Sequence, residues 1–138
     1  MFQKKEYLKM DYYYSIKVKD TFENTRKKVT DALAKEGFGV LTEINLKETF
    51  KKKLGVDFRQ YVILGACNPT YSFKAIQAED NLGTLLPCNV ILQESGKDFI
   101  SVAAVNPVES MKMVNNPEVE EVAGTIRQKL VRALESIR

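Results

Sequence analysis

The chain has 138 residues, 44% of them hydrophobic and 28% charged, with a formal net charge of +3. These values are typical of one globular domain with one core, and they exclude a disordered chain. The small net charge gives no support for nucleic-acid binding. No apolar run approaches the roughly 20 residues of a membrane helix, and residues 1–10 lack a secretory signal, so we predict a soluble cytoplasmic protein. The chain has no histidine, which excludes Ser-His-Asp and Cys-His catalysis and any imidazole metal site.

Residues 1–138 are predicted to form a single domain, with residues 1–10 as a flexible N-terminal extension. Tyr12 to Val18 alternates between two faces, which predicts a half-buried strand. Asp20 is the predicted cap of the following helix, with Glu23 three residues later in capping-box position, and Gly37 is its predicted end.

Phe38 to Ile44 is the second predicted strand. The lysine-rich segment after it predicts a short helix, because Leu46, Phe50 and Leu54 are spaced four residues apart and can form one buried face. The lysines are then its solvated face, and the alternative is a phosphate-binding patch.

Arg59 to Cys67 is predicted to be a central strand. The chain contains three Asn-Pro pairs, at 68–69, 106–107 and 116–117, and each is typical of a helix start with an asparagine cap and proline at the first position. The first of these helices is expected to run to about Asp80, followed by a loop at residues 81–84.

Residues 85–94 contain the fourth predicted strand, and a short turn at residues 95–97 leads into the fifth, Phe99 to Val105. The last helix is predicted from an apolar stripe with helical spacing: Val119, Val122, Ala123, Ile126, Leu130, Ala133, Leu134 and Ile137. The order β-α-β-α-β-α-β-β-α indicates an α+β two-layer sandwich, with a mixed or antiparallel five-stranded sheet and helices packed on one face.

Two segments stand out, Gly65-Ala66-Cys67-Asn68-Pro69 and Leu85-Leu86-Pro87-Cys88-Asn89-Val90. Cys67 directly precedes a predicted helix N-terminus, whose partial positive charge and free N–H groups favour the thiolate form. If the third and fourth strands are antiparallel, both cysteines lie at the same end of the sheet and can share a site. If the strands are parallel, the cysteines lie at opposite ends. The alternative is that both are small buried hydrophobic residues.

These segments resemble the domain-of-unknown-function family 302, and the resemblance extends from about Tyr14 to Ile137. It implies a compact two-layer α+β fold, often as a homodimer, and no established reaction. It also implies that Cys67, Asn68, Cys88 and Asn89 occupy motif positions. The more polar Thr70-Tyr71-Ser72 departs from the small or apolar residues of the family, so a pocket here can differ from that of its relatives.

Three functions follow from these observations. The first is a binding module in which Cys67, Asn68, Cys88 and Asn89 hold a small thiol-reactive ligand, or the two cysteines hold a soft metal such as Cu(I). The second is a structural or interaction homodimer with its cysteines in the core. The third is a thiol-dependent redox protein with Cys67 as nucleophile and Cys88 as resolving partner. Two cysteines cannot fill a tetrahedral zinc site without carboxylates or a dimer partner, and their spacing is not Cys-x-x-Cys.

A homodimer is also indicated by the run Tyr12, Tyr13 and Tyr14. Aromatic residues on both faces of one strand exceed what a one-sided sheet needs, and tyrosine is common at interfaces. The alternative is that the outer tyrosines simply lie on the surface.

Overall fold

The fold is described from a computed structural model, which defines residues 11–138. The predicted extension, residues 1–10, lies outside the described part of the chain. The helices and strands are β1 (Tyr13–Lys19), α2 (Phe22–Lys35), β2 (Gly39–Asn45), α3 (Leu46–Leu54), β3 (Tyr61–Cys67), α4 (Pro69–Ala78), η1 (Asp80–Leu85), β4 (Cys88–Glu94), β5 (Phe99–Val105), α5 (Pro107–Ser110), η2 (Lys112–Val114) and α6 (Pro117–Glu135). The η elements are short 3-10 helices, and η1 occupies the stretch where a loop is predicted.

The five strands form one sheet in the order β1-β5-β4-β3-β2, and every neighbouring pair is antiparallel. Strands β2 to β5 therefore follow one another as a meander, and β1 adds to the far side of β5. This confirms the α+β class and decides between the mixed and antiparallel alternatives. The antiparallel pairing of β3 with β4 determines where the two cysteines lie relative to each other.

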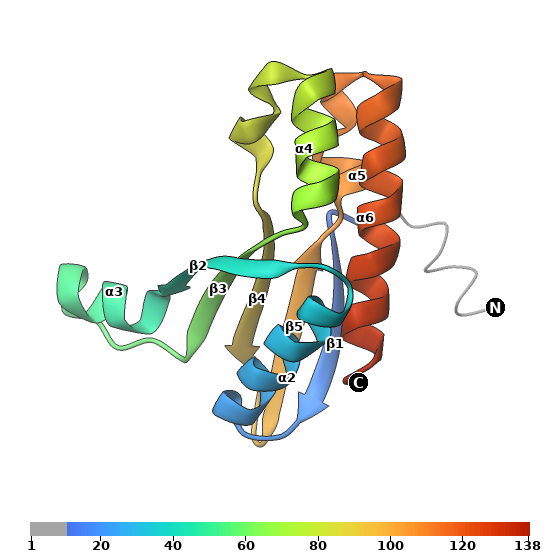
Figure 1. Cartoon of the computed structure of the whole chain (residues 1–138). Helices are drawn as coiled ribbons and strands as arrows, with labels where there is room; N and C mark the ends of the chain where they lie inside the picture. The colour runs from blue at the N-terminus through green and yellow to red at the C-terminus, as the bar shows by residue number, and fades with distance from the viewer. Residues whose placement is uncertain (1–10) are drawn as a thin grey trace.

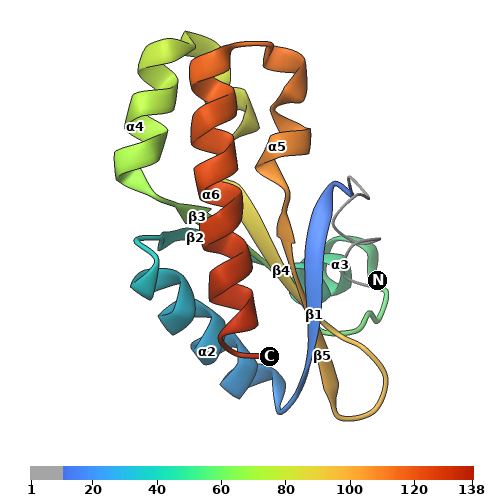
Figure 2. The same cartoon turned by 90° about the vertical axis from the view of Figure 1, so that its right-hand side faces the viewer.

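Helices α2 and α6 cover one face of the sheet, while α4 and α5 stand beyond the end of the strands beside the first half of α6 (Figures 1 and 2). Burial follows the predicted stripe of α6, whose buried residues are Val119, Val122, Ala123, Ile126, Leu130, Ala133 and Leu134. They meet core residues of the strands such as Leu64, Val90, Leu92 and Val102, which are fully buried. The apolar stripe of α6 thus unites the sheet and the helices above it in one core.

The cap of α2 is Thr21 rather than the predicted Asp20. The Thr21 hydroxyl accepts a hydrogen bond from the backbone N–H of Asn24 at 3.1 Å. Asp20 lies one residue earlier, where its carboxylate accepts from the N–H of Thr21 and pairs with Lys28 at 2.6 Å. Both residues are good caps, and the one-residue shift gives Asp20 an ion pair with Lys28 as well as a backbone bond.

The predicted buried face of α3 is wrong. None of its residues is buried, and Leu54 is 68% exposed, because the helix projects past the edge strand β2 and no layer lies over it (Figure 1). Its contacts are local: the Phe50 and Phe58 ring centroids are 5.2 Å apart, and Lys47 donates to the backbone oxygen of Phe58. Helical periodicity therefore located this helix correctly but could not say whether a partner layer exists.

All three Asn-Pro pairs begin a helix, as predicted, with the proline at the first helical position. Asn106 and Asn116 also use the side-chain oxygen as a cap, accepting from the N–H groups of Val108 and Glu118. Asn68 makes no such bond. Among residues 11–138, no helix is both long and apolar enough to cross a membrane.

Candidate functional site

Strand pairing brings Cys67 and Cys88 to one end of the sheet. Ala66 is the direct partner of Cys88, so Cys67 at the end of β3 lies one residue beyond the start of β4. The crossover between these strands, α4 followed by η1, returns the chain to the end that it left (Figure 1). The sequence left two arrangements open, and the structure has the one in which both cysteines lie at the same end.

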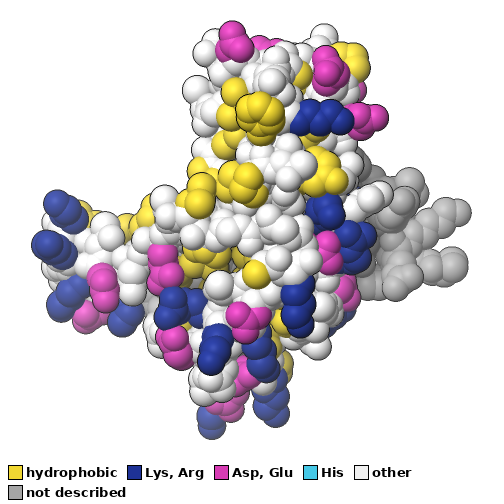
Figure 3. Space-filling view, viewed as in Figure 1, with side chains coloured by type: hydrophobic (Ala, Val, Ile, Leu, Met, Phe, Trp, Pro, Cys, Tyr) yellow, Lys and Arg dark blue, Asp and Glu magenta, His cyan; other side chains and the backbone are white. Residues whose placement is uncertain are grey.

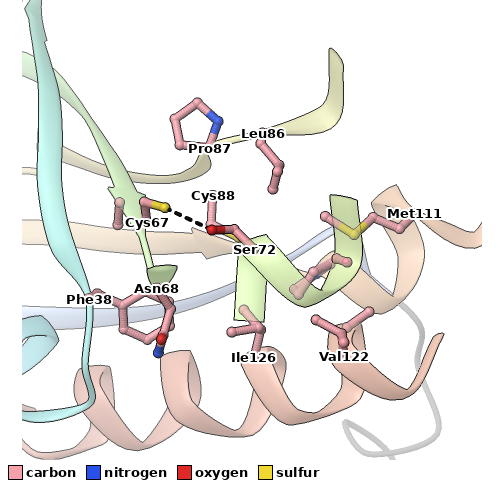
Figure 4. Close-up of a pocket in the computed structure, with 14 residues that line it drawn as sticks. Phe38, Cys67, Asn68, Ser72, Leu86, Pro87, Cys88, Met111, Val122 and Ile126 are labelled. Carbon is pink, nitrogen blue, oxygen red and sulfur yellow. Dashed lines mark hydrogen bonds between the residues drawn. The ribbon is translucent and has the colours of Figure 1, made fainter. Parts of the chain in front are cut away.

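Both cysteines line a cavity of about 30 Å³ between the ends of β3 and β4, α4 and α6. That volume holds a few atoms and is far smaller than the roughly 300 Å³ or more of a pocket for drug-sized ligands. Its wall is mostly apolar, with Asn68 and Ser72 as the polar residues beside the two thiols. Figure 4 shows the sulfur of Cys67 directed at Ser72, with Cys88 beside it and Ile126 on the other wall.

Cys67 is half-buried, and its sulfur lies 3.3 Å from the Ser72 hydroxyl oxygen in a hydrogen bond. Ser72 belongs to the first turn of α4, which begins directly after Asn68, so the turn folds its hydroxyl back over the strand end. The sequence prediction did not assign Ser72 to the site. The polar departure at residues 70–72 was the signal that could have identified it.

Cys88 is 7% exposed and belongs to the apolar core. Burial, with a smaller contribution from the charge of nearby Cys67, raises the pKa of Cys88 to about 11. Cys88 is therefore a neutral thiol at pH 7 and needs a strong ligand, or another sulfur, to lose its proton. The alternative that both cysteines are buried hydrophobic residues therefore fits the burial of Cys88, which also lines the cavity. It does not fit Cys67, which is only half-buried.

Asn68 is placed for a role other than capping. It is 7% exposed, and its side-chain Nδ2 donates to the backbone oxygen of Glu36 at 3.0 Å, which ties the start of α4 to the end of α2. Gly37 makes this contact possible: its φ is +90°, and a Cβ there would lie 3.1 Å from the Asn68 Nδ2. Asn68 therefore forms a rigid polar part of the cavity wall.

Asn89, the fourth predicted site residue, does not line the cavity. Side chains alternate along β4, and Cys88 faces the core while Asn89 is exposed. The structure thus brings Cys67, Asn68 and Cys88 together and leaves Asn89 on the opposite face of the sheet. The repeated Cys-Asn pair suggested equal roles, but strand alternation separates the second asparagine from its cysteine.

Pro87 and Met111 also line the cavity, and sequence reasoning assigned neither to the site. Pro87 follows a cis peptide bond and packs against Gly65, whose Cβ position would lie 2.8 Å from the Pro87 ring. Met111, after α5, is 5% exposed and closes another side (Figure 4). Their contribution depends on segments distant in sequence, so no local pattern indicates it.

Across residues 11–138, no cluster of three or more His, Cys, Asp or Glu side chains is arranged to hold a metal ion. A metal bound in this cavity would therefore rely mainly on the two sulfurs. Hard ions such as Mg²⁺ and Ca²⁺ need several oxygen ligands, and zinc needs four ligands. Two sulfurs in an apolar wall suit a soft ion with few ligands.

The fold and the cavity define a two-layer α+β domain with an antiparallel sheet and a small thiol-lined pocket at the sheet end. The chain belongs to the family described as domain of unknown function DUF302, whose model matches residues 14–137. It is similar to the crystal structure of an uncharacterised conserved DUF302 protein from Bacillus stearothermophilus, with a TM-score of 0.87 and 27% sequence identity over 94% of this chain and all of that one. The comparison with curated proteins found no match.

Proposed function

We propose that the chain binds a small soft ligand between Cys67 and Cys88, with Cu(I) as the preferred metal. The observation that supports this most directly is the antiparallel β3–β4 pairing, which places both thiols on the wall of one small cavity. Thiolates are preferred ligands of Cu(I), and the mostly apolar wall offers few competing oxygen ligands. The proposal applies to a reducing compartment such as the cytoplasm, where both thiols stay free.

The high pKa of Cys88 does not prevent this binding. Cu(I) replaces the proton on sulfur, so binding releases protons, and the apparent affinity rises with pH up to the Cys88 pKa of about 11.

A Cu(I) titration against a chromophoric chelator, without oxygen, tests this function. We expect one Cu(I) per chain, and an affinity at least about 100-fold lower in Cys67→Ser or Cys88→Ser, because one of two sulfur ligands is lost. Met113→Leu is the control: this thioether is 82% exposed and does not line the cavity, so affinity should not change. Wild-type protein that fails to compete, or a double Cys→Ser variant that binds equally well, would refute the proposal.

We also propose that the chain forms a homodimer through the sheet face that α2 and α6 leave uncovered. Four apolar residues lie in one cross-strand row on this face: Ile44, Ile63, Ile91 and Ala103. Ile44, on the edge strand β2, is 46% exposed, Ile63 and Ile91 are half-buried and Ala103 is buried. On β1 the row ends at Ser15, and Tyr13, two residues away on the same face, is 40% exposed. A second copy is the simplest partner that would cover such a face.

Sedimentation equilibrium tests the dimer. We expect a mass twice the 15.7 kDa of the chain at tens of micromolar, and the monomer mass for Ile91→Lys, which places a charge in the centre of the row. Lys27→Glu makes the same change of charge on the exposed side of α2, which covers the other face of the sheet, and should leave the mass unchanged. A wild-type monomer at this concentration would contradict the dimer.

A further inference from the structure

The two thiols of the cavity can also react with each other, which gives the proposed binding site a redox control. We propose that Cys67 and Cys88 form a reversible disulfide by exchange with a small disulfide such as oxidised glutathione, and that this bond abolishes soft-metal binding. The inference rests on the proposed function for its consequence, because the bond would consume both metal ligands. The exchange itself rests on geometry alone.

Strand geometry places the two residues within disulfide reach. Ala66 and Cys88 are direct antiparallel partners, so their Cα atoms lie about 5 Å apart, and Cys67 is one residue, about 3.4 Å, further along. The Cys67 and Cys88 Cα atoms are then about 6 Å apart, inside the usual range of roughly 4.4–6.8 Å for a disulfide.

Successive positions in a regular ladder face opposite sides of a sheet, which would normally separate these two sulfurs. Here Cys67 is the last residue of β3 and Cys88 the first of β4, so the β3–β4 ladder ends at these two residues, while Cys67 still pairs with Gly39 of β2. Both line the cavity, and Figure 4 shows the Cys67 sulfur turned toward the side where Cys88 lies. Forming the bond requires Cys67 to give up its 3.3 Å hydrogen bond to Ser72 and to turn its side chain toward Cys88.

The different burial of the two cysteines sets the order of the reaction. Cys67 is half-buried and can be reached from solution, whereas Cys88 is buried in the core. The Cys67 thiolate attacks one sulfur of oxidised glutathione, forms a mixed disulfide and releases one glutathione thiolate, which takes up the Cys67 proton. The Cys88 thiolate then attacks the Cys67 sulfur and releases the second glutathione, which takes up the Cys88 proton. In total, two protein thiols are oxidised and one glutathione disulfide is reduced to two thiols.

Hydrophobic side chains surround the site, and two basic residues lie near it. Figure 3 shows hydrophobic side chains gathered over the upper part of the molecule, where α4 lies, and charged ones over α2 and α3 below. Lys129 and Arg132 are the basic residues beside the start of α4 on α6: Lys129 lies over the Tyr71 ring, and Arg132 pairs with Glu36 at 2.9 Å.

Intact-mass spectrometry of the metal-free protein in glutathione redox buffers tests the exchange. Wild-type protein should lose two hydrogens and become unreactive to a thiol reagent after denaturation, and excess reduced glutathione should reverse this. Cys88→Ser should gain one glutathionyl group at Cys67, because no resolving thiol remains. Cys67→Ser should stay unmodified, because Cys88 is buried. If Cys88→Ser does not fold, judged by its circular dichroism spectrum, Cys88→Ala takes its place.

Two results would overturn the inference: wild-type protein that keeps both thiols in an oxidising buffer, or disulfides that form only between chains. A final measurement separates this inference from the proposed function. Reduced protein that binds Cu(I) but forms no internal disulfide refutes only the redox control. Protein that forms the disulfide but never binds Cu(I) refutes only the metal function. Oxidised protein that still binds Cu(I) with unchanged affinity refutes the link between them.

Discussion

Replacing Ile126 by aspartate is expected to unfold the domain. Ile126 lies in the middle of α6, is 6% exposed and contributes to both the core stripe and the cavity wall. A carboxylate there would be buried without a partner, and such substitutions cost about 4 kcal/mol or more. Small domains are stable by about 5–15 kcal/mol in total, so a loss of this size removes a large part of the stability and, toward the low end of that range, unfolds the domain. Urea denaturation followed by circular dichroism measures the change.

Gln128→Asp is the matched control, because it introduces the same residue on the exposed face of the same helix. Its free energy of unfolding should change by less than about 1 kcal/mol. If Ile126→Asp instead unfolds at the same urea concentration as this control, α6 does not pack its stripe against the sheet as described.

The second large effect is expected for Gly65→Ala. Gly65 lies in β3 between Thr42 on β2 and Asn89 on β4, and its missing side chain leaves space for two neighbours. A Cβ at this position would overlap the Thr42 hydroxyl and lie 2.8 Å from the Pro87 ring. Relieving both contacts requires a new rotamer of Thr42 and a shift of Pro87 at the start of β4, which we expect to cost about 3 kcal/mol. Thermal unfolding followed by circular dichroism measures this loss.

Gly39→Ala is the control for the change in backbone entropy. Gly39 is an exposed strand residue of β2 with nothing within 4 Å of its Cβ position, so this variant should be neutral or slightly more stable. Adding Thr42→Ala to Gly65→Ala should recover part of the loss, since one of the two overlaps disappears. Full stability of Gly65→Ala alone would show that Pro87 does not pack over β3, and the cavity wall would then need another description.

Much of the fold could be predicted from local patterns. The apolar stripe of α6 has a helical period and is buried where predicted, and the three Asn-Pro pairs all start helices. The fifth strand, Phe99–Val105, has the predicted bounds. These features depend on interactions within a few residues, namely backbone periodicity and caps, so a sequence contains the necessary information.

Local patterns could not predict whether a helix face is buried, because burial depends on a layer that is distant in the sequence. The apolar face of α3 has the spacing of a buried helix, yet Leu54 is exposed because the sheet ends at β2 and nothing lies beyond it. The cap of α2 is Thr21 and not the predicted Asp20, although both residue types cap helices well, and the Asp20 carboxylate pairs with Lys28 of the same helix. Neighbouring residues of similar capping strength cannot be told apart from the sequence pattern.

For the candidate site, the sequence alone identified the chemistry: two thiols, each followed by asparagine and within two residues of a proline, with no histidine in the chain. Only the tertiary structure decided that β3 and β4 are antiparallel, and hence that Cys67 and Cys88 meet at one end of the sheet. It also separated Asn68, which lines the cavity, from Asn89, which faces the other way. The physical reason is that the residue type at each position can be read from the sequence directly. Strand direction, and the face on which a side chain lies, instead depend on hydrogen bonds between segments more than 20 residues apart.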